Sequence, residues 1–144
     1  MPSPLKVEPM IRAHMTGVID LLQQISSFRP PLTQYESIWE NFESQGHVFS
    51  VVATNESSVI GYGSLVLEHK IRGGIMGHIE DIVVSPSHGN RGIGTLVVES
   101  LCEIASKKGC YKVALQCQDR HLGFYKKCGF ESSGTMMQRF LSFK

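Results

Sequence analysis

The sequence has no pronounced excess of charge, no long apolar run and no secretory leader. Its 14 basic and 13 acidic side chains leave a net charge of +1, whereas a general nucleic-acid-binding protein usually carries a strong basic excess. No apolar run approaches the roughly 20 residues of a membrane span, and the first residues lack the apolar core of a signal peptide. We therefore expect an intracellular protein, cytoplasmic in the simplest case, that binds neither nucleic acid nor a membrane. Import into an organelle stays open at this point.

The sequence also lacks the paired cysteines of a zinc knuckle or a dithiol redox site. Cys102, Cys110, Cys117 and Cys128 show no C-x-x-C spacing, so we expect no metal and interpret the four thiols as small core-filling side chains. With 144 residues, of which 42% are hydrophobic, the chain is long enough to bury a core. We expect one domain that spans residues 1–144.

The pattern of apolar residues predicts a mixed α/β fold in which helices cover a sheet. The predicted order is β-α-α-β-β-β-α-β-α-β, with strands near residues 5–12, 47–53, 59–67, 78–84, 111–117 and 136–143 and helices near 16–25, 33–45, 92–108 and 120–128. Pro9 favours an edge position for the first strand. Residues 69–77, with two lysine or arginine side chains and two adjacent glycines, are expected to form a loop.

One stretch, residues 77–94, organises the rest of the chain. Residues 82–84, Ile-Val-Val, are typical of a buried strand, and Gly89, Gly92 and Gly94 follow just before a helical period begins. A strand, a glycine turn and a helix N-terminus leave N–H groups free and present the positive end of a helix dipole, which suits a phosphate or pyrophosphate. The spacing matches neither a Walker A loop nor a dinucleotide fingerprint, so a plain glycine-rich connector is the alternative.

Charged residues interrupt the apolar strand just before this turn. By the two-residue period of a strand, His78 and Glu80 should share a face with Ile82, while Asp81 lies opposite. Because an unpaired charge is costly in a buried strand, we expect these side chains where the strand opens onto a cleft. There the acids could orient or deprotonate a polar substrate; solvent-facing charges at a strand start are an equally good interpretation.

Tyr125 lies in the predicted helix 120–128, shortly before Gly129. A tyrosine in this place can pack against the core with its hydroxyl at the surface, or it can donate a proton to a leaving group. From the residues alone the packing role is favoured.

Several motifs together resemble the GNAT superfamily of acetyl-CoA-dependent N-acetyltransferases. They are His88-Gly-Asn-Arg-Gly-Ile-Gly94 between a strand and a helix, and Phe124-Tyr-Lys-Lys-Cys-Gly-Phe130. Within the superfamily, the block Gly77-His-Ile-Glu-Asp-Ile-Val-Val84, Gly109-Cys-Tyr-Lys-Val113 and the Phe124–Phe130 motif resemble the glucosamine-6-phosphate N-acetyltransferase branch. The resemblance covers about half of the chain, from Glu68 to Phe140. It implies the GNAT fold: a central mixed, mostly antiparallel sheet flanked by helices, with splayed central strands.

The resemblance also implies roles for particular residues. The backbone of Ile82, Val83 and Val84 would pair with the pantetheine arm of coenzyme A, and the remaining implied coenzyme ligands are Gly89, Asn90, Arg91, Gly92, Ile93, Gly94, His121 and Tyr125. The implied substrate-binding residues are Lys70, Arg72, Glu80, Asp81, Gln116 and Arg139. Tyr125 would protonate the departing thiolate as a catalytic residue, with Glu80 as the second. Arg139 would reach the sugar phosphate across the interface of a homodimer built from C-terminal strands.

Three positions depart from the family pattern. Gly89 stands where glutamine or arginine is usual, Gln116 where an acidic residue is usual, and His121 where an asparagine contacts the coenzyme. The acidic pair Glu80 and Asp81 is therefore expected to take a larger share in orienting the amine.

The implied reaction is direct attack, in a ternary complex, of the 2-amino group of D-glucosamine 6-phosphate on acetyl-CoA. It gives N-acetyl-D-glucosamine 6-phosphate, a precursor of UDP-GlcNAc, and CoA, with a backbone N–H near Val83 stabilising the oxyanion. Three alternatives stay open: another small amine or a protein N-terminus as acceptor, a non-catalytic acyl-CoA-binding module, and a purely structural domain. The basic side chains of Lys70, Arg72 and Arg139 favour an anionic acceptor.

Overall fold

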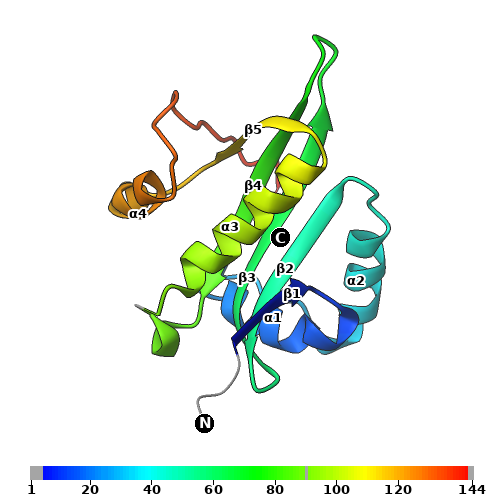
Figure 1. Cartoon of the computed structure of the whole chain (residues 1–144). Coiled ribbons are helices and arrows are strands. Elements are labelled where there is room, and N and C mark those ends of the chain that lie inside the picture. Colours follow the sequence, from blue (N-terminus) through cyan, green and yellow to red (C-terminus); the bar gives the residue numbers. More distant parts are fainter. Residues whose placement is uncertain (1–4, 90, 143–144) are drawn as a thin grey trace.

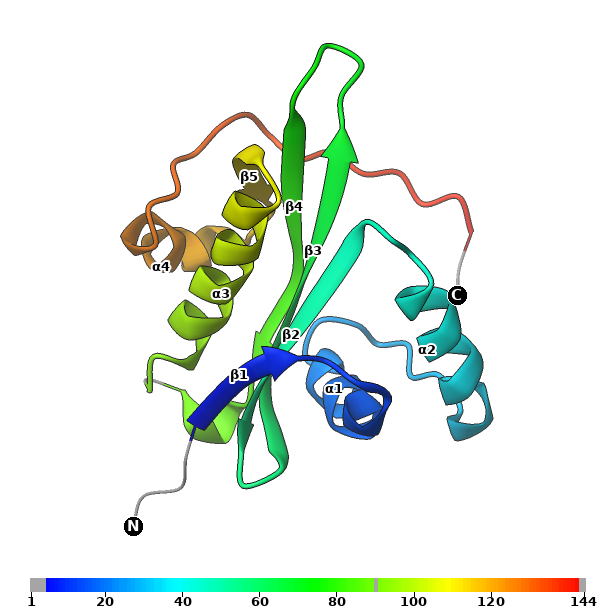
Figure 2. The ribbon, with the colours of Figure 1, turned by 45° about the vertical axis from the view of Figure 1, so that its right-hand side comes forward.

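A computed structural model describes residues 5–89 and 91–142 of the chain. Five strands form one sheet in chain order: β1 (Leu5–Pro9), β2 (Val48–Asn55), β3 (Ser58–His69), β4 (Ile75–Val84) and β5 (Cys110–Leu115). The first four strands are antiparallel to their neighbours, and β5 is parallel to β4. Helices α1 (Met15–Leu22) and α2 (Tyr35–Glu43) lie on one side of the sheet, α3 (Ile93–Lys107) lies on the other, and α4 (Leu122–Lys127) lies beside α3 (Figures 1 and 2). The predicted mixed, mostly antiparallel sheet is confirmed.

Each face of the sheet has its own hydrophobic core. On the α3 side, Val97 and Leu101 have no exposed surface and pack with Leu65 of β3 and Ile79 of β4. On the other side, α1 packs against residues of β2, β3 and β4, among them Val83. Because both faces are covered, the sheet presents its polar groups to solvent mainly at strand ends and edges.

The hairpin between β3 and β4 is longer than predicted. Residues 69–77 were expected to form a loop, but the ladder continues to His69 opposite Ile75. The chain reverses through Gly73 and Gly74, whose positive φ angles of 92° and 86° fit a tight turn. The prediction was wrong because polar residues near a hairpin tip still pair through their backbone groups, so their side chains do not mark the end of a strand.

A β-bulge in β4 changes which side chains share a face. Tyr62 lies opposite Val83 and Ser64 opposite Glu80, so one residue of β3 faces the two residues 81 and 82 of β4. Asp81 occupies this bulge with a φ of 56°. The extra residue reverses the alternation.

The prediction that His78, Glu80 and Ile82 share one face of the strand is therefore wrong for Ile82. This side chain packs into the core beneath α3, whereas His78 and Glu80 alternate with the buried Ile79 and point to the opposite face. Gly63 makes room for the arrangement, because a Cβ atom there would lie 2.5 Å from Cδ1 of Ile82.

The bulge region also contains a buried tyrosine that should affect stability at alkaline pH. Tyr62 is 5% exposed, and its burial together with the negative charge of Asp81 raises the pKa of its hydroxyl to about 12. A group whose pKa rises on folding contributes its full stability below its unfolded pKa, here about 10, and loses that contribution as the pH rises through the folded value. We expect the free energy of unfolding to fall by about 2 kcal/mol between pH 10 and 12 through this group. Urea unfolding of Tyr62→Phe should show a correspondingly smaller fall; parallel pH curves for the two proteins would contradict this.

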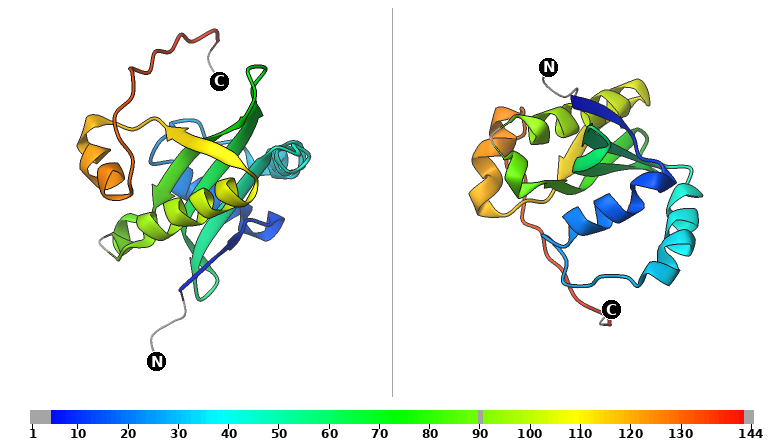
Figure 3. Two further views of the ribbon diagram at one scale, coloured as in Figure 1. Left: turned by 45° about the horizontal axis from the view of Figure 1, so that its top comes forward. Right: turned by 90° about the horizontal axis from the view of Figure 1, so that it is seen from below.

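The predicted last strand is absent from the part of the chain that the structure describes. Residues 136–142 have no strand partner, and Met137, Phe140 and Leu141 are 87%, 78% and 86% exposed. In Figure 3 (left) this C-terminal segment runs away from the sheet. An apolar segment forms a strand only where another strand offers hydrogen bonds, and none of the five described strands does so here.

Candidate active site

The strands β4 and β5 part halfway along β4. Their pairing runs from Ile75 opposite Cys110 to Ile79 opposite Leu115 and then ends, while β4 continues beside β3 as far as Val84. Beyond Leu115, where β5 ends, the chain leaves the sheet and runs toward α4 (Figures 1 and 3). Residues 80–84 therefore have a strand neighbour on one side only among the described residues, which confirms the splayed strands expected from the sequence.

The open edge of β4 presents backbone groups that can bind a ligand. The N–H of Ser85 donates to the carbonyl of Ile60 at 2.8 Å, and alternate residues of an antiparallel pair face the partner strand. The carbonyl of Val84 thus faces away from β3. The amide Nε2 of Gln24, just after α1, donates to this carbonyl at 3.1 Å, so the carbonyl accepts a hydrogen bond from outside the sheet.

The N-terminus of α3 follows this open edge and has free amides. Gly92 caps the helix with a φ of 73°, and its carbonyl accepts the N–H of Leu96 at 3.1 Å. The amides of Ile93, Gly94 and Thr95 precede that first helical bond, and within residues 5–89 and 91–142 the structure records no acceptor for them. Together with the helix dipole, these amides can bind an anion.

The predicted glycine turn is open to solvent. Gly89, Arg91 and Gly92 are exposed, whereas Asn90 lies outside the described residues. Any helix start leaves such amides without an intrahelical partner, so anion binding at this turn stays a prediction.

Three elements converge at Gly94. A Cβ atom at this position would lie 3.2 Å from Cζ of Phe124 in α4 and 3.6 Å from Cγ2 of Val84 at the end of β4. The missing side chain lets α4 approach the first turn of α3, which places Tyr125 beside the opening between β4 and β5.

Tyr125 is held by aromatic neighbours and stays protonated at neutral pH. Its ring lies edge-on to Phe124, with the centroids 4.9 Å apart, and to Phe130, with the centroids 6.0 Å apart. Burial raises the pKa of its hydroxyl, and negative charge on Cys117 or Cys128 would raise it further. A protonated phenol at this position can donate a proton to a leaving group, so the packing and catalytic interpretations of Tyr125 are compatible.

The cysteines near the opening have the properties of packing residues rather than nucleophiles. Burial, with a smaller contribution from Glu99, raises the pKa of both Cys102 and Cys128, which lowers the fraction of reactive thiolate. Cys102 and Cys110 pack against the core beneath α3.

Polar side chains stand on both sides of the opening. Glu80 and Gln116 are the residues that directly follow the last pair of β4 and β5, Ile79 opposite Leu115, and both are exposed, as is Asp81. The structure therefore brings together the backbone of residues 82–84, the start of α3, Tyr125, the acidic pair and Gln116.

Two predicted substrate-binding residues lie at the end of β4 opposite to the start of α3. Lys70 and Arg72 are at the tip of the β3–β4 hairpin, where Nζ of Lys70 lies 2.8 Å from Oε1 of Glu68 and Nη2 of Arg72 donates to the hydroxyl of Tyr111 at 3.2 Å. Strand β4 separates this tip from the start of α3 by roughly 30 Å, at about 3.3 Å per residue. Their role in substrate binding stays a prediction, as do those of His121, exposed beside α4, and Arg139, exposed in the C-terminal segment.

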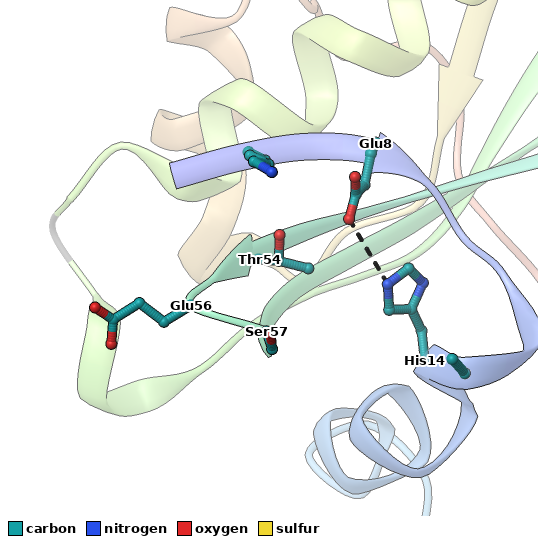
Figure 4. A pocket seen from close by; sticks show the side chains of 7 residues that line it. Glu8, His14, Thr54, Glu56 and Ser57 are labelled. Atoms are coloured by element: carbon teal, nitrogen blue, oxygen red, sulfur yellow. Dashed lines mark ion pairs between the residues drawn. The ribbon is translucent and has the colours of Figure 1, made fainter. Parts of the chain in front are cut away.

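A hollow of about 450 Å³ lies elsewhere, between β1, the start of α1 and the β2–β3 turn (Figure 4). It is lined by Lys6, Glu8, Ala13, His14, Thr54, Glu56 and Ser57. Nε2 of His14 lies 3.7 Å from Oε1 of Glu8 across it. None of the residues predicted from the sequence to bind coenzyme or substrate lines this hollow.

Comparison with known proteins identifies the family. A model of the acetyltransferase (GNAT) family matches residues 16–130. The chain belongs to the GNAT family. The GNAT chain is 40% identical over 105 residues to glucosamine 6-phosphate N-acetyltransferase of Schizosaccharomyces pombe, covering 72% of this chain and 95% of that protein. It is 34% identical over 139 residues to the enzyme of the same name from Trypanosoma brucei brucei. That alignment covers 93% of this chain and 94% of that protein.

The fold of the GNAT chain agrees with this assignment. The crystal structure of glucosamine-6-phosphate N-acetyltransferase from Arabidopsis thaliana superposes with a TM-score of 0.90 at 28% identity, over 96% of this chain and 99% of that one. In the described part of the GNAT chain, no helix is long and apolar enough to cross a membrane, and no three His, Cys, Asp or Glu side chains gather as metal ligands would. That the reaction needs no metal stays a prediction.

Sequence reasoning missed several residues of this region. Gln24, Tyr62 and Ser64 belong to no local motif, and each becomes relevant only through a contact with β4. Gln24 bonds to Val84, 60 positions later in the chain, and Ser64 bonds to Glu80, 16 positions later. Such contacts depend on strand register, which a single sequence does not specify at a bulge.

Proposed function

We propose that this GNAT chain transfers the acetyl group of acetyl-CoA to the 2-amino group of D-glucosamine 6-phosphate, giving N-acetyl-D-glucosamine 6-phosphate and CoA. The observation that carries the proposal is the open edge of β4, which leads directly into the free amides of α3 and has Tyr125 beside it through the contact of Phe124 with Gly94. The names of its relatives support the choice of acceptor.

In this proposal the coenzyme lies along the opening between β4 and β5. The pantetheine arm pairs with the backbone of residues 82–84 in the way an added strand does. Its pyrophosphate receives hydrogen bonds from the amides of Gly92–Gly94 and the charge of Arg91. Gly89, Asn90 and His121 are further predicted ligands, although the amide of Gly89 donates to the carbonyl of Pro86 at 3.4 Å in this structure. The thioester then lies near the level of Tyr125.

The chemistry is one nucleophilic displacement. Glu80 and Asp81 orient the neutral amine, whose nitrogen attacks the thioester carbonyl and forms the new C–N bond. An N–H near Val83 stabilises the oxyanion. The C–S bond then breaks, Tyr125 gives its proton to the thiolate, and solvent takes up the proton released by the nitrogen. Much of the acceleration comes from holding nitrogen and carbonyl carbon at attack distance.

The assay that tests this proposal is thiol release from acetyl-CoA. D-glucosamine 6-phosphate should give the highest kcat/KM, and unphosphorylated glucosamine a value lower by about 100-fold, since one phosphate contact to arginine is worth roughly 3 kcal/mol. Equal or higher kcat/KM for an aminoglycoside, a polyamine or a peptide N-terminus would assign another acceptor. CoA binding without thiol release from any amine would indicate a non-catalytic acyl-CoA-binding module.

We also propose that the C-terminal segment docks on a second copy and completes its site. This segment exposes Met136, Met137, Phe140 and Leu141, and β5 is an edge strand whose outer side has no partner within the described residues. An apolar strand-forming segment and an unpaired edge complement each other in a homodimer. Arg139 lies within the segment, so its guanidinium would reach the partner's acceptor site.

Removal of residues 136–144 should convert the dimer to a monomer. Light scattering coupled to gel filtration should give twice the chain mass for the full-length protein and the chain mass for the truncated form, because the exposed apolar side chains no longer link two copies. The matched variant Arg139→Met should stay dimeric but show about a 100-fold higher KM for glucosamine 6-phosphate and little change for glucosamine. A full-length protein that is monomeric at assay concentration would overturn this proposal.

A further inference from the structure

A histidine beside the acidic pair has no role in the reaction proposed above, which releases the proton of the attacking nitrogen to solvent without a protein group that receives it first. His78 of β4 belongs to a cluster with Glu68, near the end of β3, and Lys70, which follows β3. Nζ of Lys70 and Nε2 of His78 each lie 2.8 Å from the same oxygen, Oε1 of Glu68. The cluster therefore presents an imidazole that is held by a carboxylate.

His78 lies next to the opening between β4 and β5. It pairs with Ala114, and the following pair, Ile79 with Leu115, is the last one before the strands part. Because Ile79 is buried in the core beneath α3, His78 and Glu80 both lie on the opposite face of β4. Two residues on one face of a strand lie about 7 Å apart, so an amine oriented by Glu80 is within reach of the imidazole.

The contact with Glu68 determines which ring nitrogen of His78 is free. A carboxylate only accepts hydrogen bonds, so Nε2 of His78 is the donor in the 2.8 Å contact with Glu68. In a neutral imidazole the other nitrogen, Nδ1, is then unprotonated, and no partner for it is recorded among residues 5–89 and 91–142. The side chain is 33% exposed, so a ligand can reach it.

We propose that His78 is a general base of the acetyl transfer: its Nδ1 takes the proton that the nitrogen releases as the C–N bond forms, and Glu68 is the positioning residue that holds the ring in the Nε2–H tautomer. The inference rests on the proposed function, which supplies an amine at Glu80. An N–H bond of the amine breaks, the proton moves to Nδ1, and the imidazolium later passes this proton to solvent. No proton moves to Glu68.

The charged groups that face His78 come from three strands. Glu68 and Lys70 lie on the side of the hairpin tip. Glu80 lies two positions further along β4, and Lys112 of β5 lies two positions before Ala114, the partner of His78. Among these groups the carboxylate of Glu68 is the one with a recorded contact to the ring, so it is the group that stabilises the imidazolium once it forms.

The test compares His78→Gln with wild type in the thiol-release assay. Glutamine keeps an N–H donor for Glu68 but cannot take up a proton, so a purely structural role of His78 predicts little change. The base role predicts a kcat about 100-fold lower at pH 8, with the KM of both substrates within about threefold of wild type. Unchanged kcat in His78→Gln would overturn the base role.

The pH dependence of this difference is a second readout. A histidine side chain ordinarily changes charge between pH 5 and 8, and an imidazolium cannot accept a proton. The ratio of the wild-type kcat to that of His78→Gln should therefore shrink from about 100 at pH 8 to about 10 at pH 5.5. Titration of the amine affects both proteins alike and cancels in the ratio. A ratio that does not change with pH would contradict the base role.

Glu68→Gln tests the positioning role. Its amide oxygen still accepts the hydrogen bond of Nε2 but lacks the negative charge, so kcat should fall about fivefold. Because Glu68 acts on kcat through His78, the double variant should have the kcat of His78→Gln alone. Effects that multiply in the double variant would overturn this role of Glu68.

His69→Gln is the matched control. His69 is an exposed histidine at the end of β3, opposite Ile75 near the tip of the same hairpin. The variant should keep the wild-type kcat at every pH. A loss as large as that of His78→Gln would show that replacing a histidine in this hairpin, and not removal of a base, lowers the rate.

Nitrogen NMR of isotopically labelled histidines separates a failure of this inference from a failure of the proposed function. At pH 8 the signals that are missing in His78→Gln should report the Nε2–H tautomer; the Nδ1–H tautomer would overturn the inference whatever the acceptor is. If wild type acetylates another amine but not glucosamine 6-phosphate, the proposed acceptor fails, and the kcat ratios measured with that amine decide the role of His78. Turnover of no amine would overturn both proposals.

Discussion

Replacement of Tyr125 by phenylalanine should lower kcat about 100-fold while leaving the KM for acetyl-CoA within about threefold of wild type. The variant keeps the ring that packs against Phe124 and Phe130 and loses only the proton that we assign to the departing thiolate. Burial raises the pKa of Tyr125 above its usual value of 10, so the acid is fully protonated at neutral pH. The wild-type rate should therefore fall only as the pH rises beyond 10, and the variant should lack this alkaline limb.

Tyr35→Phe is the control for loss of a tyrosine hydroxyl, because Tyr35 belongs to α2 and packs against the core on the opposite face of the sheet. It should retain wild-type turnover. Initial rates of thiol release between pH 6 and 10.5 provide the comparison. A Tyr125→Phe protein with unchanged kcat over this range would remove Tyr125 from the mechanism.

Replacement of Gly92 by valine should weaken CoA binding about 100-fold. Gly92 caps α3 with a φ of 73°, a conformation that a β-branched residue avoids. The backbone should leave the left-handed region and turn the first amides of α3 away from the pyrophosphate. Two lost charge-assisted hydrogen bonds, at roughly 1.5 kcal/mol each, account for the expected loss. Calorimetric titration with CoA measures it directly.

Gly109→Val serves as the matched control at the other end of the same helix. Gly109 follows α3 with a φ of 86°, so valine there introduces the same backbone strain some 15 residues away from the anion site. Both variants should melt at lower temperature, but only Gly92→Val should lose CoA affinity. Equal losses of affinity would show that stability, and not the direction of the amides, limits binding.

The parts of the site that depend on local sequence could be predicted. The start of α3 at Gly92, its buried face and its end near Gly109 follow from helical periodicity and from two glycines with positive φ. The strand at residues 82–84 and the glycine turn after it follow in the same way. The identity of the family came from motifs that recur in relatives and is confirmed by the family match over residues 16–130.

The parts that depend on strand register or on the presence of a pairing strand could not be predicted. A two-residue period has no place for the extra residue at Asp81, so Ile82 was assigned to the wrong face. The tip of the β3–β4 hairpin looks like a loop because its polar side chains face solvent while its backbone stays paired. The segment at 136–142 has the apolar pattern of a strand, but within residues 5–89 and 91–142 no strand pairs with it.

The most direct test of the central claim is a map of backbone amide shifts during titration with CoA. We expect the largest changes at residues 82–84 and 92–95 and in α4 around Tyr125, where β4 and β5 part and α3 begins. A second addition, of glucosamine 6-phosphate, should then shift Glu80 and Asp81. Changes confined to the hollow between β1 and α1, or no changes at saturating CoA, would contradict the assignment of this opening as the coenzyme site.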